Sequence, residues 1–109
     1  ITNFNGITPA YPAYPSAHAG FGGGGAKILS SFLENTPGYD DSYTFTDISH
    51  QFETTFLGTP RVFTSITQIG EECAYSRIPF GVNYRMDCVV GLEVGRLAAK
   101  RVLELPWKK

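Results

Sequence analysis

Two short motifs contain residue types that could bind an anion and transfer a proton. The first is Pro15-Ser16-Ala17-His18, at the predicted start of a helix. Backbone N–H groups in a first helical turn have no partner within the helix and lie at its positive end, so they attract anions. Ser16 adds a hydroxyl, and His18 can titrate near neutral pH. The motif indicates an oxyanion site with a general acid–base, although an ordinary helix cap followed by a surface histidine explains the same residues.

The second motif is Ser76-Arg77, followed by Asn83 and then by Asp87. A guanidinium group presents a planar fork of donors that suits phosphate-like oxyanions. Asn83 and Asp87 are four residues apart, so they share one face if both lie in the same helix, where Asp87 could orient a neighbour. An arginine and an aspartate that simply pair at a helix terminus are the alternative.

A run of glycines follows the first motif and contains the pattern GxGxxG at Gly20, Gly22 and Gly25. A dinucleotide site needs a strand before this pattern, and a proline-rich arm precedes it here instead. The phosphate-loop pattern GxxxxGK[ST] is also absent. We therefore predict that these glycines serve helix packing and not nucleotide binding.

Three helices are predicted to position these motifs. The first spans residues 16–33, with Ser16 as its N-cap. Each interior glycine costs roughly 1 kcal/mol relative to alanine, so this helix must pack tightly against its neighbours. The second runs from Thr59-Pro60 to about residue 77, and the third is capped by Asn83 and runs to about residue 105.

The connections between these helices are long. Residues 34–59 are predicted to form a loop with a short strand within residues 43–47. In the third helix, Gly91 and Gly95 are four residues apart, which allows another backbone to approach closely. Three helices with long irregular connections indicate the all-α class.

Composition limits the classes of function. The chain has 109 residues, enough for one small domain or a piece of a larger one. Its formal net charge of −1 argues against a nucleic-acid-binding protein. The sequence contains no run of 18 apolar residues, so no transmembrane helix is predicted. Cys73 and Cys88 allow either one disulfide or two buried thiols.

Taken together, the two motifs resemble those of vanadium-dependent haloperoxidases and of the type-2 phosphatidic acid phosphatase superfamily to which they belong. The superfamily signature has three blocks: Lys-x6-Arg-Pro, Pro-Ser-Gly-His and Ser-Arg-x5-His-x3-Asp. This chain matches the second and third blocks in order and spacing. The resemblance implies the C-terminal helices of an all-α bundle that holds vanadate, or phosphate or sulfate in its place. Residues 1–15 would form an extended arm and residues 16–109 the C-terminal part of the helical domain.

The resemblance also implies a role for each matching residue. Ser16, the N–H of Ala17, Arg77 and Asn83 would bind the oxygens of the anion. His18 would act as the catalytic acid–base, and Arg77 would neutralise the oxyanion. Asp87 would support the residue at position 83, which is the position of the vanadium ligand. In haloperoxidases, hydrogen peroxide bound at the vanadate oxidises a halide.

Three departures from the signature change the expected activity. The Lys-x6-Arg-Pro block is missing, so either its cations come from a lost N-terminal part or from another chain, or the site is empty. Asn83 replaces the histidine that ligates vanadium, and its amide nitrogen has no available lone pair for metal binding or nucleophilic attack. Ala17 replaces the glycine of the second block, and its backbone N–H group is still able to bind the anion.

We therefore predict a haloperoxidase-like protein with impaired halide oxidation. The alternative is a non-catalytic structural or interaction subunit derived from that family, and a phosphatase ranks third because its nucleophile position is Asn83. The predicted partners are the remainder of the polypeptide or another protein chain, with small anions and peroxide if the protein is active. The resemblance favours a location outside the cytoplasm or in an organelle lumen.

Overall fold

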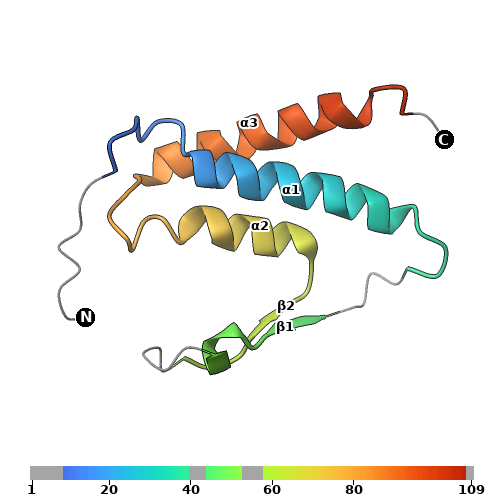
Figure 1. Ribbon diagram of the computed structural model, residues 1–109, viewed down its shortest axis with the longest axis horizontal. Helices are drawn as coiled ribbons and strands as arrows, with labels where there is room; N and C mark the ends of the chain where they lie inside the picture. The colour runs from blue at the N-terminus through green and yellow to red at the C-terminus, as the bar shows by residue number, and fades with distance from the viewer. Residues whose placement is uncertain (1–8, 40–43, 53–57, 108–109) are drawn as a thin grey trace.

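The framework of the molecule is a set of three α-helices. The computed structural model describes residues 9–39, 44–52 and 58–107. The helices are α1 (Ala17–Glu34), α2 (Ile66–Tyr75) and α3 (Arg85–Leu103). Helix α1 lies between the other two and packs extensively against both, whereas α2 and α3 contact each other much less (Figure 1). The predicted all-α class is confirmed.

Helix α1 begins where the sequence predicted. Ser16 is its N-cap, and the Ser16 Oγ accepts a hydrogen bond of 3.3 Å from the N–H of Ala19. The glycine run is helical, and most of it faces the neighbouring helices. A Cβ added at Gly23 would lie only 2.7 Å from the carbonyl oxygen of Leu92. Tight packing therefore accompanies the low helix propensity of this run, as predicted.

Helix α3 approaches α1 equally closely, through the two glycines that the sequence singled out. A Cβ at Gly91 would collide with the carbonyl oxygen of Ser16, and one at Gly95 would collide with the carbonyl oxygen of Gly20. Both positions are buried. Because no side chain fits between the two backbones here, the prediction of a close approach at these glycines is confirmed.

A small antiparallel hairpin precedes α2. Strand β1 (Phe45–Asp47) pairs with β2 (Arg61–Phe63), so that Phe45 lies opposite Phe63 and Asp47 opposite Arg61. Strand β1 falls within the segment predicted as a short strand. The predicted start of the second helix at Thr59-Pro60 is wrong, because residues 61–63 pair with β1 and Ser65 is the N-cap of α2.

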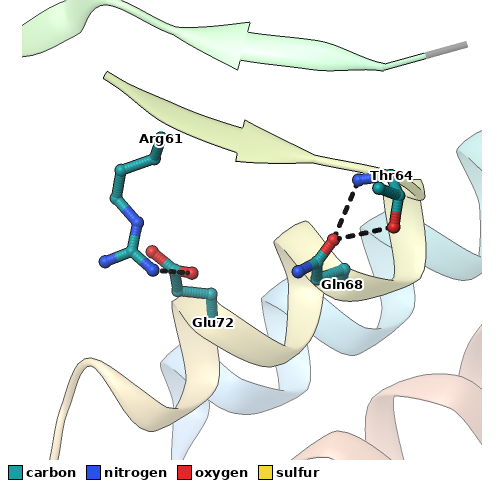
Figure 2. Close-up of polar contacts among 4 residues, drawn as sticks. All are labelled: Arg61, Thr64, Gln68 and Glu72. Atoms are coloured by element: carbon teal, nitrogen blue, oxygen red, sulfur yellow. Dashed lines mark hydrogen bonds and ion pairs between the residues drawn. The ribbon is translucent and has the colours of Figure 1, made fainter. Parts of the chain in front are cut away.

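Two polar contacts attach the hairpin to α2 (Figure 2). Arg61 and Glu72 form an ion pair of 2.6 Å between β2 and α2. The Gln68 side chain reaches back to the residue that follows β2, where its Oε1 accepts from the N–H of Thr64 at 2.9 Å and from the Thr64 hydroxyl at 3.2 Å. The Ser65 Oγ in turn accepts from the N–H of Gln68 at 3.1 Å. This reciprocal arrangement resembles a capping box and fixes the start of α2.

The buried core is small. Its apolar members are mostly small side chains, namely Ala19, Phe63, Ala74, Cys88, Leu92 and Ala99. The radius of gyration of 16.2 Å exceeds the roughly 13 Å expected for a compact domain of about 100 residues. Many large apolar side chains of the described helices stay exposed, among them Phe21, Phe32 and Leu97.

The two cysteines differ in environment. Both thiols are free, with Cys73 exposed on α2 and Cys88 buried in α3. Neither prediction, a disulfide or two buried thiols, describes this pair. Within the described ranges, no helix is long and apolar enough to cross a membrane.

Candidate functional site

Ser16 anchors the N-terminal end of α1 through three hydrogen bonds. Besides capping α1, its Oγ donates to the Asn83 Oδ1 at 3.1 Å. Its backbone N–H donates to the carbonyl oxygen of Asp87 at 3.0 Å. Only 2% of Ser16 is exposed. The first predicted motif is thus joined directly to the second, across 67 residues of sequence in the case of the Ser16–Asn83 bond.

Asn83 uses both ends of its carboxamide in these contacts. While its Oδ1 accepts from Ser16, its Nδ2 donates to the carbonyl oxygen of Ala13 at 2.7 Å. Asn83 is 8% exposed. The prediction that Asn83 caps α3 is wrong, because Tyr84 is the N-cap and Asn83 lies outside the helix. The amide instead ties the segment before α1 to the start of α3.

Asp87 lies in the first turn of α3 and is 2% exposed. Its Oδ2 accepts a hydrogen bond of 2.8 Å from the N–H of Tyr84. A carboxylate here accepts a hydrogen bond from an N–H group that has no partner within the helix. The positive end of the helix dipole also stabilises its charge. No side-chain hydrogen bond joins Asp87 to Asn83 within the described residues. The two residues lie in the same region, and Asp87 stabilises its own helix start.

Arg77 lies in the turn between α2 and α3. The N–H of Val82 donates to the Arg77 carbonyl at 3.2 Å, and Gly81 adopts a φ of +71°, which glycine takes without strain. The guanidinium carbon lies 5.6 Å from the ring centroid of Phe80. The Arg77 Nε is buried and has no hydrogen-bond partner within the described chain. A buried donor without a partner suits an acceptor such as an oxyanion.

The Cys88 thiol lies among the predicted site residues. Burial raises its pKa and the Asp87 carboxylate adds to the rise, while the Arg77 guanidinium and a hydrogen bond with Ser16 oppose it. Residues from both motifs therefore surround one buried sulfur. The sequence predicted a disulfide or a buried thiol at Cys88 and did not place it at the candidate site, although it directly follows Asp87 and shares the buried side of α3 with Leu92.

Ala17 and His18 occupy the first turn of α1, and both are exposed. Their position agrees with the expected place beside the N-terminus of the helix. The described residues offer the His18 side chain no hydrogen bond or ion pair. Its role as acid–base therefore stays a prediction, as do the anion-binding roles of Ser16, Ala17, Arg77 and Asn83.

A distinct cavity of about 390 Å³ lies toward the other end of α1. Leu33, Tyr39, Phe45 and Phe63 contribute to its apolar lining, and none of the predicted site residues does. The anion site that the resemblance implies for Ser16, His18 and Arg77 does not coincide with this cavity.

Vanadate, which the resemblance implies, fits these residues only in part. The buried Nε of Arg77 and the N-terminus of α1 suit an oxyanion held by hydrogen bonds. A bond from the protein to vanadium needs a stronger donor than the Asn83 carboxamide, whose oxygen already accepts from Ser16. In the part of the chain that is described, no three His, Cys, Asp or Glu side chains group as metal ligands. The residues fit a hydrogen-bonded anion and do not fit a protein-ligated vanadium.

Comparison with known proteins agrees with the motifs. The sequence model of the VCPO second helical-bundle domain matches residues 2–106. The fold is similar to the crystal structure of a bacterial vanadium-dependent iodoperoxidase, with a TM-score of 0.67 and 28% sequence identity. The match covers 89% of this chain and 21% of the iodoperoxidase chain, so the chain spans about a fifth of that protein's length. Comparison with curated proteins found no match. The chain belongs to the VCPO second helical-bundle domain family, within the vanadium haloperoxidase superfamily.

Proposed function

We propose that this chain forms part of a haloperoxidase-like protein that holds a tetrahedral oxyanion by hydrogen bonds and is impaired in halide oxidation by hydrogen peroxide. The anion is vanadate, phosphate or sulfate, which share the same shape and acceptor groups. Family membership supports the superfamily assignment. The proposed impairment rests on Asn83, whose carboxamide is hydrogen-bonded at both ends.

The carboxamide of Asn83 is the central observation. Its Nδ2 donates to Ala13 at 2.7 Å, and its Oδ1 accepts from Ser16 at 3.1 Å. An imidazole at this position would offer a nitrogen lone pair to vanadium, whereas an amide nitrogen offers none. With both ends of the amide engaged and 8% of the residue exposed, Asn83 serves as a structural link. The anion therefore lacks its covalent anchor to the protein.

The remaining residues still suit binding of an anion. The Arg77 guanidinium supplies positive charge and a buried Nε–H without a partner in the described chain. The N–H groups of Ala17 and His18 lie in the first turn of α1, at the positive end of its dipole. His18, which is exposed in the same turn, is the proposed acid–base residue. Ser16 holds this turn in place through its bonds to Asn83 and Asp87.

One arginine does not balance a multiply charged anion in a partly dry site. The Lys-x6-Arg-Pro block that would supply further cations is not present in these 109 residues. We propose that the cations come from the remainder of the polypeptide or from another chain. Binding of the anion would then depend on that contact and on ionic strength.

The test is an assay of the complete protein with added vanadate, hydrogen peroxide and, in separate reactions, iodide, bromide and chloride. We expect little or no turnover from the natural sequence and a gain from Asn83→His. Asn83→Gln is the matched control, because it keeps a carboxamide without a nitrogen lone pair, and it should give no gain. Rapid turnover by the natural sequence would contradict the proposed impairment.

Binding of the anion is tested separately by calorimetric titration with inorganic phosphate and with vanadate. Arg77→Ala should weaken binding by roughly tenfold or more, because a hydrogen bond to a charged group contributes about 1.5–3 kcal/mol. Arg85→Ala is the control, since the Arg85 guanidinium lies over the Tyr75 ring at 5.4 Å. Equal binding by the protein and by Arg77→Ala would contradict the assigned role of Arg77.

A second candidate function is that of a non-catalytic interaction subunit. The large exposed apolar side chains favour it, among them Phe21 at 85% and Phe32 at 65% exposed. Absence of anion binding in the titration, together with co-purification of one fixed partner chain, would favour this function over an oxyanion site.

A further inference from the structure

Helix α1 presents an apolar side to the outside of the molecule as well as to its neighbours. Phe21 is 85% exposed, Phe32 65% and Leu29 48%. At about 100° per residue, these side chains and their neighbours fall within roughly a third of the helix circumference. This outer face of α1 consists of Phe21, Gly25, Ile28, Leu29 and Phe32. It carries no ionisable side chain.

Gly25 is the second, independent sign that something covers this face. A Cβ at Gly22, Gly23 or Gly24 would lie 3.0, 2.7 or 3.1 Å from a carbonyl oxygen of α2 or α3. A Cβ at Gly25 would meet nothing within 4 Å. A helix-interior glycine is less favourable than alanine, and within the described chain Gly25 has no contact that requires it. A backbone from outside these residues would supply that contact.

The side chains around Gly25 give the face the shape of a notch. Phe21 and Leu29 lie one turn before and one turn after it on the same side of α1. A glycine between two large apolar residues lets a second helix axis come close while its side chains pack against both flanks. The occupant that fits is a helix with an apolar stripe and a small residue at the crossing point.

We infer that this occupant is a helix of a preceding helical-bundle domain in the same polypeptide. Two findings support that source over others. The matching family is described as a second helical-bundle domain, and this chain spans 21% of the length of the iodoperoxidase that it resembles. The small core and the radius of gyration of 16.2 Å agree with a bundle that is completed by further helices. The inference rests on family membership and is independent of the proposed anion site.

The test uses the complete protein and the variant Gly25→Ala. If the outer face were open, alanine would raise the melting temperature because it is the better helix former. With a helix packed at Gly25, the added methyl group instead lowers the melting temperature by about 2 °C or more. Gly23→Ala is the matched control, because its methyl would clash with Leu92 in either case. A rise in melting temperature for Gly25→Ala would overturn the inference.

A labelling experiment keeps the inference testable if Gly25→Ala does not fold. In Phe21→Cys, iodoacetamide should modify the new thiol at least tenfold more slowly than the exposed Cys73 of the same molecule, as measured by peptide mass mapping. Equal labelling rates would contradict a covered face. The mass of the particle, measured by light scattering, identifies the source. A monomer is expected, and a dimer that Gly25→Leu converts to monomer would overturn the assignment by naming a second copy as the occupant.

Discussion

The two sides of α1 differ in how they use small residues. On the inner side, Gly23 and Gly24 bring the backbone of α1 against that of α3, and Gly22 brings it against that of α2. On the outer side, Phe21, Leu29 and Phe32 project without cover. Both sides are apolar, so hydrophobicity alone does not tell which side packs within this chain. The contacts that a Cβ would make at each glycine do distinguish them.

The inner side of α1 stabilises the described helices, whereas we infer that the outer side packs against a helix from outside them. The inner side is fixed by close backbone contacts and by buried hydrogen bonds at the start of α1. The outer side contributes little to the described core, since Phe21, Leu29 and Phe32 keep 48% or more of their surface exposed. Substitutions on the inner side should therefore be far more damaging to these helices than substitutions elsewhere on the surface.

The largest expected effect follows from Gly95→Ala. The new Cβ would collide with the carbonyl oxygen of Gly20, and backbone atoms cannot move aside as a flexible side chain can. We expect a loss of about 3 kcal/mol or more in the free energy of unfolding, measured by urea denaturation. Val94→Ala changes the adjacent residue, whose side chain is exposed. It should alter the free energy of unfolding by about 0.5 kcal/mol or less. Similar losses for both variants would remove the distinction between the close α1–α3 contact and the exposed surface of α3.

A smaller loss of stability is expected from Asp87→Ala, in the first turn of α3 where it meets the start of α1. This variant deletes a carboxylate that is 2% exposed and accepts from the Tyr84 N–H at 2.8 Å. Loss of an N-terminal acceptor of this kind costs about 1–2 kcal/mol. Asp87→Asn retains an acceptor oxygen and should lose less. Glu93→Ala, at an exposed position of the same helix, is the control and should leave stability nearly unchanged.

The sequence predicted best those features that a short pattern of residue types marks. The Ser16 cap, the close approach at Gly91 and Gly95, and the short strand were all predicted and observed. The start of α2 was not, because Pro60 has the signature of a first helical residue, whereas pairing with β1 draws residues 61–63 into a strand. Local propensity was overridden there by a contact with a distant segment.

The candidate site shows the same limit. The motifs predicted that Ser16 and the Ser-Arg-x5-Asn-x3-Asp block lie together, and the Ser16–Asn83 hydrogen bond joins them. The roles of these residues toward an anion stay predictions. The partner of the Asn83 Nδ2 is a backbone carbonyl 70 residues away, at Ala13, and no side-chain pattern marks such an acceptor. Asn83 was therefore predicted as a helix cap, which is its most frequent local use.

The two thiols provide a comparison at alkaline pH. Burial raises the pKa of Cys88 above its ordinary value, so the folded protein holds that proton more firmly than the unfolded chain does. Stability is then complete below the unfolded-state pKa and falls as pH rises toward the folded-state pKa. We expect a smaller loss of stability here than from Asp87→Ala. It should appear as a lower urea midpoint at pH 10 than at pH 8. This difference between the two midpoints should be smaller in Cys88→Ala. Cys73→Ala, which removes the exposed thiol and keeps Cys88, is the matched variant for comparison.

The smallest expected effect concerns the contact that joins the hairpin to α2, on the surface and away from the inner side of α1. Arg61 and Glu72 lie 2.6 Å apart, with side chains 63% and 34% exposed (Figure 2). Solvent screens such a pair, and its contribution is about 0.5 kcal/mol or less. A double-mutant cycle with Arg61→Ala and Glu72→Ala should give a coupling of that size, which disappears in 1 M salt. A coupling above about 1 kcal/mol would mean that the hairpin is held as firmly as the helices, and that the stability of this chain is not confined to the inner side of α1.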